Sequence, residues 1–133
     1  MKPGLLGEAS VRVNRSNTAS ALGNEGVDVF ATPFLVGLME EAARNAVEPH
    51  LPEGMLTLGG LVEVKHLAPT PLGFEIRASA CLLEVKGAKL VFEVGIVDGV
   101  ERIGEGRHVR FVATQEAFAK MVREKTSSRR RGN

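Results

Sequence analysis

Tryptophan and tyrosine are absent from this chain of 133 residues, and phenylalanine supplies all of its aromatic side chains. Proteins that bind single-stranded nucleic acid usually stack the bases on several aromatic rings, so the chain has little material for such a surface. Its formal net charge is only +1, which is too small for a polyanion-binding surface spread over the whole chain. We therefore expect no nucleic acid partner.

Cysteine is also scarce, since Cys81 is the single one, and this excludes an intrachain disulfide and a thiol cluster for zinc. The first residues contain no long apolar stretch before Glu8, which argues against a signal peptide. No apolar run reaches the length of about 18 residues that a membrane span requires. Phosphate-binding loops, dinucleotide-binding glycine patterns, metal-ligand clusters and GxSxG motifs are missing too. We expect a cytoplasmic protein that needs no metal or redox cofactor.

The length of the chain suits one domain. We place this domain at residues 1–126 and interpret residues 127–133 as a basic tail, which carries Arg129, Arg130 and Arg131. A solvated, disordered tail is the simpler interpretation, and a weak contact with phosphate groups is the other.

Hydrophobic periodicity predicts an α+β domain in which one long central helix is wrapped by a five-stranded antiparallel sheet. Thr32 and Pro33 have the features of a helix start, with the threonine hydroxyl as cap, and Pro49 ends that helix. Residues 14–28 are small and polar and read as a loop. Thr114 caps a short C-terminal helix. The predicted strands begin near residues 8, 56, 74 and 90 and after the turn at Asp98-Gly99.

Glu40 lies at the border of the polar face of the predicted helix. A boundary carboxylate paired with Arg44 one turn later would explain it. This is the simpler interpretation, and a partly buried carboxylate that serves as a base or a nucleophile is the other.

His66 lies on the apolar face of the strand that begins near residue 56, and this pattern assigns Leu56, Leu58, Val62 and Val64 to the same face. A core histidine and a proton shuttle both fit this position. Gly59-Gly60 interrupts the same strand and indicates either a bulge or a close approach of the backbone to a ligand. In the second case, a free N–H group there could stabilise an oxyanion.

His108 and Arg110 share a face of the last predicted strand with Gly104 and Gly106. A face cleared of bulk by glycines could admit a ligand, and a solvated strand face is the alternative. We include both side chains among the expected substrate-binding residues.

Three segments together resemble hotdog-fold acyl-CoA thioesterases of the fluoroacetyl-CoA thioesterase type. They are Phe30–Ala42, Leu58–Pro71 and Asp98–Arg110, and the resemblance covers roughly residues 5 to 125. It implies a hotdog fold and a homodimer, possibly a higher oligomer, with the active site at the subunit interface. The implied reaction is the hydrolysis of a small acyl-coenzyme A thioester, with coenzyme A present only as part of the substrate.

The resemblance also assigns roles by position. Thr32, Glu40 and His66 match the catalytic residues of the family, the amide of Gly59 matches one that contacts the thioester carbonyl, and Arg110 matches an arginine near the site. Because Thr32 and Glu40 lie about 12 Å apart along one helix, we hypothesise that Thr32 of one subunit works with Glu40 and His66 of the other.

One segment departs from the family pattern. Residues 23–28 are small and polar where the fluoroacetyl-specific member carries bulky lid residues, so the resemblance extends to the reaction class and not to the acyl group. A hydratase or dehydratase on the same fold, and a non-catalytic module that binds or senses acyl-CoA, remain alternatives.

Overall fold

The structure is a computed structural model that describes residues 1–132 of the chain. A seven-residue strand, β1, precedes the long helix α1, and four more strands and a second helix follow. Two short 3₁₀ turns and a loop connect β1 to α1. The bounds are β1 (Leu6–Arg12), α1 (Thr32–Val47), β2 (Met55–His66), β3 (Glu75–Lys86), β4 (Lys89–Val97), β5 (Arg102–Thr114) and α2 (Gln115–Gly132).

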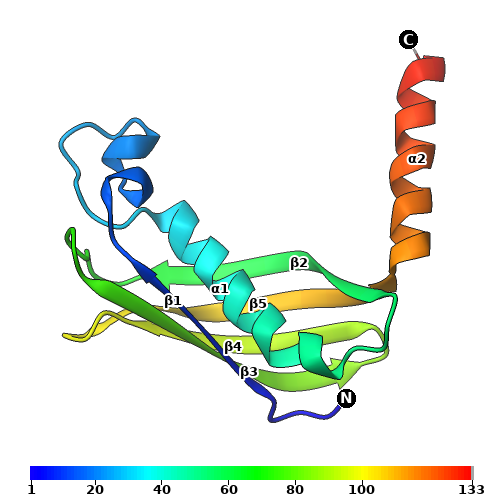
Figure 1. The fold of residues 1–133 in the computed structure, drawn as a ribbon, viewed down its shortest axis with the longest axis horizontal. Coiled ribbons are helices and arrows are strands. Elements are labelled where there is room, and N and C mark those ends of the chain that lie inside the picture. The colour runs from blue at the N-terminus through cyan, green and yellow to red at the C-terminus, as the bar shows by residue number, and fades with distance from the viewer. Residues whose placement is uncertain (133) are drawn as a thin grey trace.

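The five strands form one sheet in the order β1-β3-β4-β5-β2, and every neighbouring pair is antiparallel. The sheet curls around α1, which lies across one of its faces (Figure 1). This confirms the predicted architecture of one long helix wrapped by a five-stranded sheet. The strands β1 and β2 form the two edges. In the described part of the chain, β2, which carries three of the predicted site residues, therefore has one side without a strand partner.

Small residues let α1 approach the sheet closely. Ala42, Ala43 and Ala46 are buried on the helix, and a Cβ placed on Gly7 of β1 would collide with the helix backbone at Ala42 and Ala46. Only glycine therefore fits at this crossing. The tight contact fixes the direction of α1 and with it the position of Glu40.

A β-bulge shifts the faces of β2. The register with β5 slips between Gly59 and Leu61, so that Gly60 is the extra residue. An added residue turns every following side chain to the other face. The predicted common face for Leu56, Leu58 and His66 is therefore wrong: before the bulge, Thr57 and Gly59 face α1.

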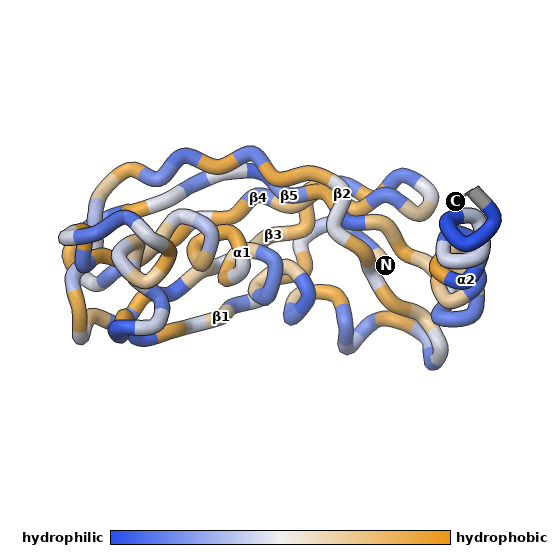
Figure 2. The backbone as a smooth tube through the Cα atoms, turned by 90° about the horizontal axis from the view of Figure 1, so that it is seen from above, coloured by the Kyte–Doolittle hydropathy of each residue, from blue (hydrophilic) through white to orange (hydrophobic). Residues whose placement is uncertain are grey.

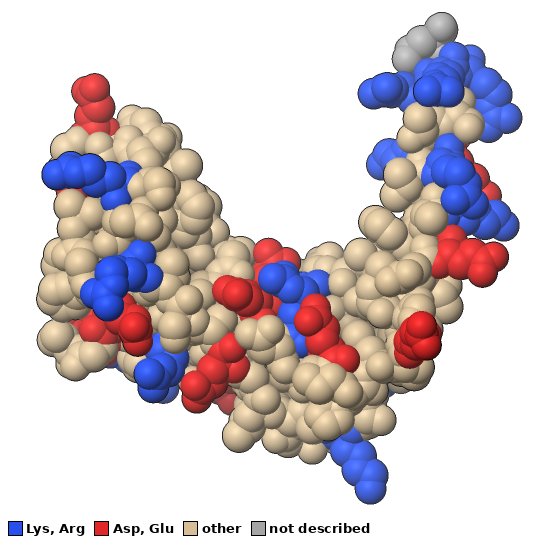
Figure 3. Space-filling model, viewed as in Figure 1, with Lys and Arg blue, Asp and Glu red and all other residues tan. Residues whose placement is uncertain are grey.

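The C-terminal helix α2 leaves the body of the domain and stands apart from it (Figures 1 and 3). The Thr114 hydroxyl accepts a hydrogen bond from the N–H of Ala117 at 3.0 Å, which confirms the predicted cap. The helix continues through residues 127–132 and is strongly hydrophilic at that end (Figure 2). The division of the chain at residue 126 stays a prediction, and Asn133, the end of the predicted tail, lies outside the described residues. In residues 1–132, no helix is both long and apolar enough to cross a membrane.

Asp98 joins the β4–β5 turn to the segment that follows His66. Its Oδ2 accepts a hydrogen bond from the buried Thr70 hydroxyl at 2.8 Å, and its Oδ1 accepts from the N–H groups of Val100 and Glu101, each at 3.0 Å. Burial alone would raise the pKa of Asp98, but these hydrogen bonds outweigh burial and hold the pKa below its ordinary value. The ionised form of Asp98 is thus the one that stabilises the contact between the β4–β5 turn and the segment after His66.

We expect Asp98→Ala to lower the free energy of unfolding by about 3 kcal/mol at neutral pH, because it leaves three donors without their charged acceptor. The stabilisation is present above the ordinary pKa of about 3.9 and is lost as the pH falls through the lowered native pKa. Urea unfolding at pH 7 and pH 3 measures both effects. The exposed Glu101, in the same turn, supplies the matched variant Glu101→Ala, and equal losses for the two variants would contradict this role.

Candidate active site

Thr32 and His66 form one half of the candidate site. Thr32 is the first residue of α1 and His66 the last of β2. The Thr32 Oγ1 and the His66 Nδ1 lie 2.7 Å apart. The predicted capping role of the Thr32 side chain is wrong, because Ala31 is the N-cap and no side chain caps the helix. The hydroxyl instead holds the imidazole.

This contact leaves Nε2 as the free nitrogen of His66. The atom is buried and has no hydrogen-bond partner among the described residues. Burial lowers the pKa of His66, and the backbone of Ala68 offsets part of that effect. At neutral pH the ring is therefore mainly uncharged and suited to exchange a proton through Nε2.

A hollow of about 370 Å³ opens beside this pair, and its lining includes Asn24, Val27, Thr32 and His66. Residues of the loop before α1 thus form one wall of the space next to the imidazole. From the predicted lid position, residues 23–28, Asn24 and Val27 line this space.

Glu40 and Arg110 form the other half. Arg110 Nη1 donates to Oε2 of Glu40 at 3.4 Å, and the Arg110 side chain is only 5% exposed. Thr57 anchors the same guanidinium, since its Oγ1 accepts from Nε and its carbonyl from Nη2, each at 2.8 Å. The alternative pairing of Glu40 with Arg44 is wrong, because Arg44 pairs with Glu48 at 3.9 Å.

His108 lies behind Arg110. Its Nε2 is 3.1 Å from Nη1 of Arg110 and its Nδ1 is 2.8 Å from the carbonyl oxygen of Leu61. The residue is fully buried and its ring stacks on Phe92. The predicted alternative of a solvated strand face is wrong, since His108 and Arg110 both lie inside, between the sheet and α1.

Gly59 lies next to Glu40, Arg110 and His108. A Cβ placed on Gly59 would lie 2.9 Å from Oε2 of Glu40 and 3.5 Å from both Nη1 of Arg110 and Cε1 of His108. The predicted bulge at Gly59-Gly60 is confirmed. The approach of the Gly59 backbone to a ligand stays a prediction, and in the structure this glycine lies next to the Glu40 carboxylate. Thr57 is the residue that the sequence pattern missed, and only the phase shift at the bulge could have revealed it.

We expect Gly59→Ala to lower kcat at least about tenfold while the melting temperature changes little. The new methyl group meets the flexible end of Glu40, so the carboxylate moves and the fold stays, and small misplacements of reacting groups are costly. Steady-state kinetics and thermal unfolding measure the two quantities. Gly106→Ala is the control, because its methyl group would meet the backbone of Glu63 and lower stability instead. An unchanged kcat for Gly59→Ala would contradict the assignment.

The two halves are separate within one chain. Gly59 and His66 are seven residues apart in β2, about 23 Å along an extended strand. The hypothesis that groups His66 with Glu40 and assigns Thr32 to the other subunit therefore needs correction, because Thr32 and His66 belong to the same half. Among residues 1–132, no group of three His, Cys, Asp or Glu side chains is placed to hold a metal ion.

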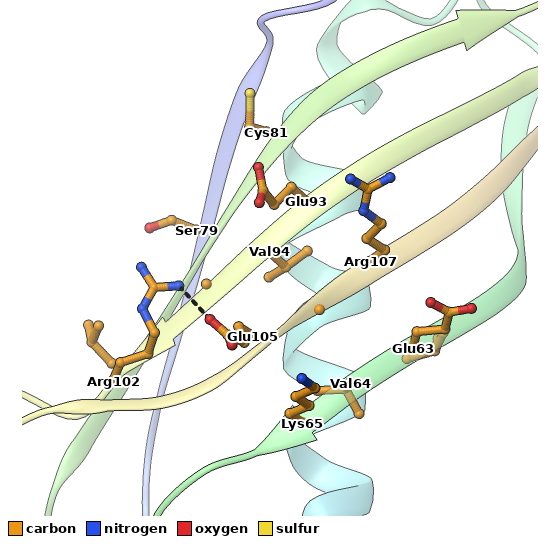
Figure 4. Close-up of a pocket in the computed structure, with 14 residues that line it drawn as sticks. Glu63, Val64, Lys65, Ser79, Cys81, Glu93, Val94, Arg102, Glu105 and Arg107 are labelled. Atoms are coloured by element: carbon orange, nitrogen blue, oxygen red, sulfur yellow. Dashed lines mark ion pairs between the residues drawn. The ribbon is translucent and has the colours of Figure 1, made fainter.

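A larger hollow, of about 1140 Å³, lies on the opposite face of the sheet and contains none of the predicted site residues. Charges of both signs line it (Figure 4), including the ion pair between Arg102 and Glu105 at 3.7 Å. Acidic and basic side chains are equally numerous in its lining, so the hollow has no net charge that would favour an anionic substrate. Because it also contains none of the predicted site residues, we do not assign the reaction to this larger space.

Comparison with known proteins identifies the family. A family model described as fluoroacetyl-CoA-specific thioesterase matches residues 13–116. The fluoroacetyl-CoA thioesterase of Streptantibioticus cattleyicolor is 44% identical over 99 residues, which cover 74% of this chain and 71% of that protein.

Solved structures agree. A structure of the fluoroacetyl-CoA thioesterase FlK has a TM-score of 0.88 at 37% identity and covers 94% of this chain and 97% of its own. A thioesterase superfamily member from Thermus thermophilus has a TM-score of 0.88 at 25% identity, with 99% and 97% of the two chains covered. The chain therefore belongs to the fluoroacetyl-CoA-specific thioesterase family and has the hotdog fold.

Proposed function

We propose that the protein hydrolyses a small acyl-coenzyme A thioester at a site composed of Thr32 and His66 from one subunit and Glu40 and Gly59 from another. The observation that carries the proposal is the position of Glu40, whose carboxylate lies directly under Gly59 and beside Arg110. A carboxylate next to a backbone segment that can stabilise an oxyanion is suited to acyl transfer.

In the proposed reaction, the Gly59 amide donates a hydrogen bond to the thioester carbonyl oxygen. Glu40 activates a water molecule or itself attacks the carbonyl carbon to form a transient anhydride, which water then opens. A C–O bond forms, the C–S bond breaks, and the thiol of coenzyme A leaves with a proton. His66 transfers protons through Nε2, and Thr32 orients the ring through Nδ1. We propose no further cofactor.

The division of the site explains why we propose a homodimer. Within residues 1–132 the outer edge of β2 has no strand partner, and exposed strand edges tend to pair. If two copies of β2 pair antiparallel around a two-fold axis near Val62, the partner's His66 lies close to Gly59, and two equivalent sites result. Leu61 and Phe111 lie near this edge and are 45% and 43% exposed. Pairing of two copies would remove these apolar side chains from water, which supports a dimer at this edge.

The acyl group is small in this proposal, because the hollow beside Thr32 and His66 is small and bounded by the loop before α1. The relatives are named for fluoroacetyl-CoA. Here Gly23, Asn24 and Gly26 give the loop little apolar bulk, so we expect weak discrimination between acetyl and fluoroacetyl groups. We propose the cytoplasm as the compartment.

Release of free thiol from a panel of acyl-CoAs tests the function: acetyl, fluoroacetyl, propionyl, isobutyryl and benzoyl. We expect turnover of the short-chain members and slow turnover of benzoyl-CoA. Tight binding of the panel without any thiol release would contradict hydrolysis and favour a binding or sensing module. A separate incubation with an α,β-unsaturated acyl-CoA tests the alternative, since hydration of its double bond with the thioester intact would favour a hydratase.

A further inference from the structure

We propose that His108 is a positioning residue of this site, which is oriented by the bulge that carries Gly59 and acts through Arg110, the partner of Glu40. The inference rests on the proposed function, because it concerns how the reacting groups are held. His108 itself touches no substrate in this proposal, in contrast to the binding role that its place in the sequence suggested.

The contacts of His108 determine its hydrogen positions. Leu61 offers a carbonyl oxygen to Nδ1 at 2.8 Å, so Nδ1 must carry a hydrogen and donate. Arg110 has only donors, so Nε2, 3.1 Å from its Nη1, must accept. The ring is therefore uncharged, with its hydrogen on Nδ1, and it can join these two partners only in this form.

The two partners have different roles. The Leu61 carbonyl belongs to the bulge, one residue beyond Gly60, and its hydrogen bond with Nδ1 fixes the orientation of the His108 ring, so that Nε2 faces Nη1 of Arg110. Arg110 gives Nη1 to both His108 and Glu40, at 3.1 Å and 3.4 Å. With His108 as an acceptor, the guanidinium is held between two partners and does not close fully on the carboxylate.

The surroundings keep His108 in this form and away from solvent. The residue has no exposed surface, and its ring stacks on Phe92 with the ring centres 6.3 Å apart. Burial lowers the pKa of His108, with Arg110 and Arg44 acting in the same direction and the Leu61 carbonyl and Glu40 against it. A second proton would bring a cation against Arg110 and break the connection.

Three substitutions at this position separate the two bonds. Phe fills the space and makes neither bond. Gln places an acceptor near the position of Nε2 and can restore the contact with Arg110, whereas Asn reaches only the position of Nδ1 and can restore the contact with Leu61. We expect His108→Phe to lower kcat by about 10- to 100-fold, the loss typical when a residue that orients the ligands of a metal site is replaced, with less than a threefold change in KM.

We expect His108→Gln to recover most of the lost kcat and His108→Asn to recover little, although both amides replace the ring with similar cost in melting temperature. A structural role alone would give Gln and Asn the same kcat, and this outcome would overturn the proposal. All rates are measured at least 15 degrees below the lowest melting temperature, a margin that keeps every variant folded.

A double-mutant cycle with Arg110→Met completes the test. If His108 acts through Arg110, then His108→Phe lowers kcat by less than about threefold in the Arg110→Met background, because contacting residues are non-additive. Full additivity of the two losses would overturn the proposal. If the wild-type protein releases no thiol from any acyl-CoA, the proposed function fails; additive losses in an active enzyme leave the function standing and reject only the role of His108.

Discussion

Glu40→Gln is expected to reduce kcat for thioester hydrolysis by at least about a hundredfold, the low end for loss of an acid–base group, while the protein stays folded. The amide keeps an oxygen for Nη1 of Arg110, which lies 3.4 Å from the carboxylate in the native site. It removes the negative charge that either activates water or attacks the thioester. The change therefore isolates the chemistry of the carboxylate from its packing.

Stability is expected to change little in this variant. The Arg110 guanidinium retains both bonds to Thr57 and the bond to His108, so no buried donor group loses all of its partners. Glu41→Gln is the matched control, because the neighbouring residue on α1 is exposed. Steady-state kinetics with acetyl-CoA and thermal unfolding decide the matter. If Glu40→Gln retains more than about a tenth of the wild-type kcat, Glu40 is a structural residue.

Much of this fold could be predicted from local patterns. The helical period around Glu40 and the alternation in the strands define one long helix and five strands, and helix α1 begins at Thr32 and ends at Val47, close to the predicted limits. Such periodicity survives in the sequence because one face of each element must be buried. The alternation alone does not show which face of the sheet the residues on each side of a β-bulge occupy.

The bulge at Gly60 shows this limit. A single extra residue reversed the faces of the first part of β2 and brought Thr57, a residue without any functional signature, to the guanidinium of Arg110. The partner of Thr32 was equally hidden, because its hydrogen bond to His66 spans 34 residues. Contacts between residues so far apart in the sequence depend on how the sheet curls around α1, and the local sequence pattern does not predict that curvature.

Mixing two inactive variants is expected to restore activity if each site is shared between two subunits. His66→Ala removes the imidazole from one half of the site, and Glu40→Ala removes the carboxylate from the other half. In a mixed dimer, the intact His66 half of one chain meets the intact Glu40 half of the other. Half of the dimers formed by random exchange are mixed, and each has one intact site of two, so about a quarter of the wild-type activity should appear.

Thr32→Ala mixed with His66→Ala supplies the control for this experiment. Because Thr32 and His66 lie 2.7 Å apart in the same chain, both changes damage the same half, and every site in a mixed dimer has one defective Thr32–His66 pair. This mixture should stay at the activity of its separate components. Native mass spectrometry of an isotope-labelled pair confirms that subunits exchange. Exchange without recovery in the His66→Ala and Glu40→Ala mixture would show that one chain supplies the whole site. Recovery in both mixtures would show that Thr32 and His66 of one chain serve different sites.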